Sequence, residues 1–247
     1  MDNNVIKSFI PKNTLNPKVW DNPDDVEKAK IKPEIKKGLL DIAKEFIEFL
    51  DEDIFVEDIM LTGSLSNFNW SEFSDFDLHI IIDLEQFDDE GEVYLKLFST
   101  KKTLFNDKHD LTIKDYDVEV YPQDEKEKHD AQGQYSLMND EWLAKPKKEK
   151  IPINKSKLTL KINHWVSVIE KTLSEADESS LKVSKSKIKK LTDKLTKFRK
   201  RGLEKDGEFS NENLVFKYLR RTGLLDKLYN YTYKKRTKEL SIESDFI

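Results

Sequence analysis

The spacing of hydrophobic residues changes about halfway along the chain. Up to about residue 122, short apolar runs that alternate with polar residues are interspersed with segments of helical spacing, whereas beyond residue 150 only helical spacing occurs. Strands and helices that follow one another in this way are typical of an α/β domain. The pattern therefore predicts an α/β domain followed by an α-helical C-terminal domain.

In the first half, the pattern predicts three strands and two helices. The strands cover residues 55–62, 78–82 and 116–121, and a helix within residues 88–105 separates the last two. Pro122 either ends the third strand or places it near a sheet edge. Another helix starts at Pro33, since proline suits a first helical turn, and its apolar face consists of Ile35, Leu39, Ile42, Ala43, Phe46, Ile47 and Leu50. A small hairpin is expected over residues 135–143. Residues 1–32 predict an extended arm that packs on this domain through Ile10, Leu15, Val19 and Trp20.

The second half predicts three helices that pack as a small bundle. Their apolar stripes are Leu158, Ile162, Trp165, Val166, Ile169 and Leu173, then Leu181, Ile188, Leu191, Leu195 and Phe198, and then Leu214, Val215, Tyr218, Leu219, Leu225, Leu228 and Tyr229. Gly202 to Gly207 should end the second helix, Ser210 or Asn211 should cap the third, and Gly223 should interrupt it. The expected domains are residues 1–144, which include the arm, and residues 151–240, with a charged linker between them.

Two carboxylates stand one residue apart at the start of the strand over residues 78–82. Side chains alternate along a strand, so Asp75 and Asp77 point to the same side, about 6.5 Å apart, while Phe76 points into the core. Like charges so close repel each other, and a divalent cation with oxygen ligands, Mg²⁺ or Mn²⁺, relieves the repulsion. Glu119 on the next strand is a candidate third acid, and Asp117 shares its face and remains open as the alternative.

A Gly-Ser pair stands just before these carboxylates. Gly63 allows a tight turn with close backbone approach, and Ser64 offers a hydroxyl and a backbone N–H to a phosphate. Nucleotidyl transfer needs a phosphate-binding turn beside a pair of metal-binding carboxylates.

The order of these parts resembles the signature of the DNA polymerase beta superfamily of nucleotidyltransferases. The likeness rests on an apolar strand, Gly63-Ser64, a ten-residue spacer, Asp75-Phe76-Asp77 and a third acid on a later strand, and it covers roughly residues 35 to 122. It implies a polymerase-beta-like domain with a short mixed sheet and a helical domain beside the nucleotide cleft. It also implies Asp75, Asp77 and Glu119 as catalytic and metal-binding residues, and Gly63 and Ser64 as residues that hold a nucleoside triphosphate such as ATP.

The resemblance leaves two questions open. One is whether the chain transfers a nucleoside monophosphate or is a retired member of the superfamily that binds nucleotides or acts as a structural or interaction protein. The other is the acceptor, for which RNA, a protein hydroxyl and a small molecule all remain candidates. The N-terminal arm and the segment NLVFKYLRRTGLLDKLY also resemble tailed-phage proteins that carry this domain.

The composition excludes several kinds of site and bears on where the protein is located. The chain has no cysteine, which excludes disulfides, thiolate metal sites and a cysteine nucleophile, and no apolar run approaches the ~20 residues that span a bilayer. The first residues lack the apolar core of a signal peptide. We therefore expect no membrane association and a cytoplasmic protein, in the host cytoplasm if a phage encodes it.

Charge is divided unequally along the chain. Residues 1–143 carry 16 basic and 34 acidic residues, whereas residues 144–247 carry 27 basic and 14 acidic ones. The basic half suggests a polyanionic substrate, and the candidates to face phosphates are Arg199, Lys200, Arg201, Arg220 and Arg221. Without aromatic residues interleaved on a clear basic stripe, however, we interpret the lysine-rich helices as having solvated outer faces.

Overall fold

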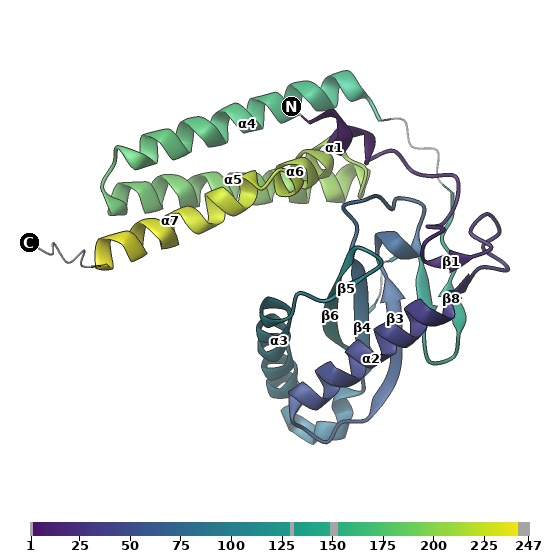
Figure 1. Cartoon of the computed structure of the whole chain (residues 1–247). Helices are drawn as coiled ribbons and strands as arrows, with labels where there is room; N and C mark the ends of the chain where they lie inside the picture. Colours follow the sequence, from purple (N-terminus) through teal and green to yellow (C-terminus); the bar gives the residue numbers. More distant parts are fainter. Residues whose placement is uncertain (1, 129–130, 149–152, 242–247) are drawn as a thin grey trace, which may run out of the picture. The chain divides into compact units, whose positions relative to one another are not determined.

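The computed structural model describes residues 2–128, 131–148 and 153–241, which form a mixed α/β structure with a helical C-terminal part (Figure 1). The chain divides into two compact units, Pro11–Lys150 and a second unit that combines Met1–Ile10 with Ile151–Ile247. The division falls at the predicted linker. The first ten residues, however, belong with the helices and not with the sheet.

The sheet of the first unit has six strands in the order β5-β6-β4-β3-β7-β8. The strands are, in that order, Thr112–Ile113, Tyr116–Asp124, Phe76–Ile82, Val56–Thr62, Gln134–Ser136 and Glu141–Ala144. Strands β4 and β6 pair in parallel, and the other neighbours pair antiparallel, so the sheet is mixed. A separate two-stranded ribbon joins β1 (Trp20–Asp21) to β2 (Lys30–Ile31).

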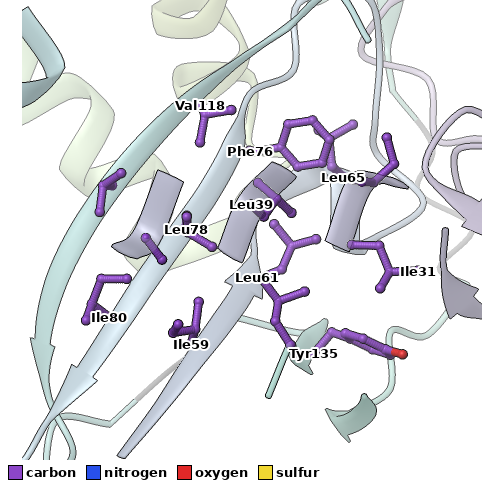
Figure 2. Packing of buried hydrophobic residues seen from close by; sticks show 14 of the residues in the cluster. Ile31, Leu39, Ile59, Leu61, Leu65, Phe76, Leu78, Ile80, Val118 and Tyr135 are labelled. Carbon is purple, nitrogen blue, oxygen red and sulfur yellow. The ribbon is translucent and has the colours of Figure 1, made fainter. Parts of the chain in front are cut away.

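The core of this unit lies between the sheet and two helices, α2 (Pro33–Leu50) and α3 (Gly91–Lys108). Alternate residues of β4, namely Phe76, Leu78 and Ile80, are fully buried in it, and Figure 2 shows them beside Leu39 of α2 and Leu61 of β3. The residues between them on β4 must therefore face the opposite side of the sheet. This alternation places the candidate acids away from the core.

The arm behaves as predicted only in its second part. Leu15, Val19 and Trp20 are buried in the core of the α/β unit, where the Trp20 ring stacks on Trp142 with centroids 4.5 Å apart. The expected contact through Ile10 is wrong, since its side chain is 40% exposed. Nor is the arm extended throughout, because α1 (Asn3–Lys7) is helical and Asp2 caps it by accepting a hydrogen bond from the Asn4 N–H. Val5, Ile6 and Phe9 are buried in the core of the helical unit.

Strand β6 runs three residues beyond its predicted end, through Pro122 to Asp124. On this strand Val120 turns its N–H and C=O away from β4, toward the side-chain amide of Asn106 on α3. Pro122 has the same parity as Val120, so its missing N–H lies on the outer side as well. The proline therefore costs no hydrogen bond between strands.

The helical unit contains four long helices where three were predicted. They are α4 (Lys155–Asp177), α5 (Leu181–Asp206), α6 (Asn211–Arg221) and α7 (Leu224–Leu240). Gly223, with φ of 69°, ends one helix and begins another instead of interrupting a single one. Ser210 caps α6 as expected, since its side chain accepts from the Asn213 N–H. Among the helices that the structure describes, none is long and apolar enough to cross a membrane.

Gly202 does not end α5, which continues to Asp206. A Cβ on Gly202 would lie 2.4 Å from the Glu212 Cβ and 2.8 Å from the Ser210 Oγ. The glycine therefore serves close packing between α5 and the start of α6, and the helix ends at Gly207, whose φ is 69°.

Candidate active site

Three neighbouring strands bring polar side chains into one row on the face of the sheet opposite the core. Asp77 on β4 is the register partner of Thr62 on β3 and of Glu119 on β6. Adjacent strands lie about 4.8 Å apart, so the Asp77 and Glu119 backbones are immediate neighbours. Asp75 precedes β4 and shares this face by alternation, and all three acids are half-buried.

Gly63 lies directly against the Asp77 carboxylate. Its φ of 75° and ψ of −158° belong to a region of backbone conformation that is open almost only to glycine. A Cβ at this position would stand 1.7 Å from Asp77 Oδ2, so no other residue fits without moving that carboxylate. The Asp77 carboxylate therefore occupies the space that a side chain just after β3 would need.

Ser64 begins the short 3-10 helix Ser64–Ser66, which follows β3. Its hydroxyl donates to Ser74 Oγ at 2.7 Å, and Ser74 Oγ also accepts from the Ser71 N–H at 3.0 Å. The first and last residues of the loop over 64–74 are thus joined directly. This contact holds Asp75, the next residue, close to the Gly63-Ser64 turn.

Tyr121 lies two residues beyond Glu119 on the same face of the sheet. Its hydroxyl donates a hydrogen bond to Glu119 Oε2. Burial raises the pKa of this hydroxyl far above its usual value, and the hydrogen bond to Glu119 and the negative charges of Glu119, Asp77 and Asp75 raise it further. The phenol therefore stays protonated at neutral pH.

Three further polar residues surround Tyr121. The His79 ring stacks on the Tyr121 ring with centroids 5.1 Å apart, and His79 Nδ1 is hydrogen-bonded to Gln123 Oε1 at 2.7 Å. Lys102 of α3 places its Nζ 4.3 Å from the centroid of the Tyr121 ring. Beside the stack lies a hollow of about 180 Å³ that His79, Tyr121 and Gln123 help to line.

The alternation that identified the acids could have indicated two of these residues. His79 is two positions beyond Asp77, and Tyr121 is two beyond Glu119, so both belong to the acidic face. Lys102 gave no such signal, because it reaches the site from a helix that lies elsewhere in the sequence.

Asp117, the alternative third acid, lies at the start of β6. It faces the same side as Glu119 but is exposed, and its register partner is Thr112 of β5. The acid level with Asp77 is Glu119. The register thus places Glu119, and not Asp117, next to the Gly63–Asp77 contact.

The donor set fits a hard divalent cation by its chemistry, since it consists of carboxylate oxygens on adjoining backbone positions. The combined negative charge that acts on Tyr121 is also what such an ion would neutralise. Within the described residues, no three His, Asp or Glu side chains stand close enough together to hold an ion as they are oriented here. The structure brings the acids onto one face, and metal binding would require their side chains to turn toward one another.

Comparison with known proteins does not assign the chain to a family. No protein-family model matches the chain, and no curated protein or solved structure matches it either.

Proposed function

We propose that the chain is a metal-dependent nucleotidyltransferase that moves a nucleoside monophosphate from a nucleoside triphosphate to an acceptor hydroxyl. The observation that carries the proposal is the row of Thr62, Asp77 and Glu119 on one face of three adjoining strands, with Gly63 against the Asp77 carboxylate. Asp75 lies two residues before Asp77 on the same face. The resemblance of Gly63-Ser64 and Asp75-Phe76-Asp77 to the signature of the polymerase beta superfamily supports the same function.

Asp75, Asp77 and Glu119 would hold Mg²⁺ or Mn²⁺, which when bound would offset the charge of the triphosphate and of the leaving pyrophosphate. Gly63, which has no side chain, lets the backbone of the turn lie directly against the Asp77 carboxylate, and so keeps the turn beside the acids. Ser64 supplies a backbone N–H and a hydroxyl, which can turn from Ser74 to a phosphate oxygen.

In this scheme Glu119 accepts the proton of the acceptor hydroxyl while the hydroxyl oxygen bonds to the α-phosphorus and the bond to pyrophosphate breaks. Tyr121 orients Glu119 by its hydrogen bond to Oε2 and leaves the other carboxylate oxygen available. Since the Tyr121 pKa is raised, the phenol does not compete as a base.

Nucleotide binding without transfer is the second candidate. The observation that favours it is the same hydrogen bond, because it occupies one oxygen of the carboxylate that must take up the proton. This alternative keeps the binding role of Gly63 and Ser64 and gives the acids a purely electrostatic one.

The two candidates are separated by following the α- and γ-phosphates of the nucleotide. The full chain is incubated with Mg²⁺, with nucleoside triphosphates labelled at either position, and with RNA, protein and small hydroxyl compounds in turn. Transfer predicts that the α-label becomes attached to one acceptor class and that the γ-label appears in pyrophosphate. Asp77→Asn should abolish the transfer, whereas Asp110→Asn, at an exposed position outside the row, should not.

Binding of nucleotide without attachment of the α-label to any acceptor supports the second candidate. Attachment of the γ-label indicates a kinase and contradicts both candidates, and so does a failure to bind any nucleotide.

A further inference from the structure

A row of basic side chains follows one side of α5 in the helical unit. Its members are Lys190, Lys194, Lys197, Arg201 and Lys205. Steps of three and four residues keep side chains on one side of a helix, and these five span about 22 Å along the axis at 1.5 Å per residue. The row is therefore a continuous basic stripe, which we call the α5 row.

The α5 row forms one wall of a groove of about 720 Å³. Lys157, Lys161 and Trp165 of α4 also line the groove, as does the start of α6. In all, seven cationic side chains and three carboxylates line it. Two of the carboxylates already have cationic partners. Glu212 is ion-paired with Lys161, and Asp206 Oδ2 lies 3.9 Å from Nζ of Lys205, the last residue of the α5 row. The third carboxylate is Asp193, and the seven cations outnumber the three carboxylates, so the groove carries a net positive charge.

Two aromatic rings lie among these cations. Phe198 and Trp165 pack together with ring centroids 5.0 Å apart. Lys161 Nζ lies 5.7 Å from the Phe198 centroid and Lys194 Nζ lies 5.5 Å from the Trp165 centroid. Phe198 is half-buried, whereas Trp165 is only 4% exposed. A planar group that enters the groove would therefore meet Phe198 first, with Trp165 behind it as support.

The distribution of charge on α5 distinguishes the α5 row from a solvated helix face. The buried stripe of this helix includes Ile188, Leu191 and Leu195. Along the length of the groove, its other flank consists of Thr192, Thr196, Arg199 and Leu203, with a single charge among them, whereas Lys182, Lys185 and Lys189 lie outside the groove nearer the start of the helix. Within the part of the chain that the structure describes, Lys190, Lys194, Lys197 and Arg201 form no ion pair. Along the groove, the unpaired cations of α5 therefore lie on the flank that faces the aromatic rings.

The other arginines named from the sequence have different surroundings. Arg221 donates to Ser8 Oγ at 2.6 Å and lies over the Phe9 ring, which ties it to α1 and its neighbours. Arg199 donates from Nε to Asn213 Oδ1 and lies over Phe216. Of the five candidates, Arg201 alone lines the groove.

We propose that this groove binds single-stranded nucleic acid. The α5 row would contact successive phosphates, and a base would stack on Phe198, since positive charge that tracks a backbone and an aromatic platform for bases are what single-strand binding needs. A duplex is a poorer ligand, because its bases already stack on one another. The groove lies within the helical unit, so this proposal stands whether or not the chain is a nucleotidyltransferase.

The first test uses the salt dependence of binding. Fluorescence anisotropy of labelled oligo(U), oligo(dT) and a duplex is measured with the full chain over a range of salt concentrations. The variant Lys190→Gln/Lys194→Gln/Lys197→Gln should bind more weakly, and its slope of log K against log salt should be shallower by about 2, at about 0.7 for each lost phosphate contact.

The matched control is Lys182→Gln/Lys185→Gln/Lys189→Gln, which removes the same charge from exposed positions of α5 outside the groove. It should leave the slope nearly unchanged. Equal losses in the two triple variants would mean that only net charge matters, and would overturn the proposal. Tighter binding of the duplex than of both single strands would overturn it as well.

The second test concerns stacking. Phe198→Leu keeps an apolar side chain without a ring and should weaken binding about fivefold to 100-fold, whereas Phe198→Tyr should keep it. Thermal melting shows whether each variant is folded. Polyglutamate, a polyanion without bases, should compete poorly with oligo(U).

If polyglutamate binds as tightly as oligo(U), the groove is a site for an acidic protein segment and the proposal is wrong. This comparison decides the question even if Phe198→Leu does not fold. A folded Phe198→Leu variant with unchanged affinity would contradict the proposal equally.

Discussion

Gly63 is subject to two separate constraints, a positive φ and contact with the Asp77 carboxylate. Gly207 allows them to be separated, because its φ of 69° and ψ of −159° nearly match those of Gly63 while no atom lies within 4 Å of its potential Cβ. Gly207→Ala should therefore cost only backbone strain, about 1–3 kcal/mol of unfolding free energy. Gly63→Ala should cost more and should also displace Asp77. Denaturant unfolding of both variants measures the difference, and equal costs would show that the Asp77 contact carries no energy.

Tyr121 provides a prediction that depends on pH. Its pKa is raised in the folded chain, so the stabilisation that its protonated hydroxyl contributes is fully present below about pH 10, the ordinary tyrosine value, and is lost as the pH rises further. Tyr121→Phe keeps the ring that stacks on His79 and removes the hydrogen bond to Glu119, which should cost about 1 kcal/mol at neutral pH. The difference in unfolding free energy between the two proteins should shrink above pH 10. A difference that stays constant to pH 11 would refute this assignment.

Single residues show where sequence reasoning succeeds and where it stops. Alternation alone placed Asp75 and Asp77 on one side of β4, because each strand position has only two directions. The same rule applied to β6 would have added Tyr121 to the acidic face. Lys102 was out of reach, since its place beside Tyr121 depends on how α3 packs along β6.

Among the secondary-structure elements, the outer edge of β6 is closed in an unusual way. The Asn106 side chain of α3 donates to the Val120 C=O and accepts from the Val120 N–H, both at 3.2 Å, as a neighbouring strand would. Asn106→Leu should leave both backbone groups without these partners and should cost about 1–3 kcal/mol. Asn106→Asp keeps the acceptor and should cost less.

Hydrogen exchange at the Val120 amide gives the direct readout for this edge. Exchange should accelerate in Asn106→Leu and change less in Asn106→Asp. If both variants exchange at the rate of the unmodified chain, the edge is protected by something other than Asn106.

Elements with strong local signals were predicted well. Helix α2 begins at Pro33 as expected, and the hairpin of β7 and β8 forms where it was placed. Helix α5 and strand β6 are longer than predicted, because a glycine and a proline had to be interpreted without knowledge of the packing. Gly202 lies inside α5 because α6 needs the space, and Pro122 lies inside β6 because its nitrogen faces the outer edge. Neither reason is contained in the local sequence.

On the scale of the whole molecule, the chain returns to the helical unit after leaving it. Phe9 is 4% exposed, belongs to the helical core and lies under Arg221, although more than 140 residues separate it from α4. Phe9→Ala should cost about 3–5 kcal/mol. The loss should appear in the hydrogen exchange of α4 to α6, while amides of the sheet, such as that of Leu78, keep their rates. Faster exchange in the sheet alone would contradict the assignment of these residues to the helical unit.

The charge division of the molecule was visible in the sequence, but its meaning was not. The basic half was interpreted as solvated helix faces because no aromatic residue appeared within a basic stripe. The rings of Trp165 and Phe198 were counted only as core residues, and the packing of α4 against α5 brings them into the basic groove. The contact between the two helices creates the groove, and the spacing along either helix gave no sign of it.

We propose that the three acids and the Gly63-Ser64 turn bind a nucleoside triphosphate together with a divalent ion. Calorimetric titration of the full chain with a non-hydrolysable nucleoside triphosphate, in Mg²⁺ and then in chelator, tests it most directly. We expect saturable binding in Mg²⁺ and little or none in chelator, because the unneutralised carboxylates repel the triphosphate. Equal affinity in the two conditions, or no binding in either, would contradict metal-dependent nucleotide binding at this site.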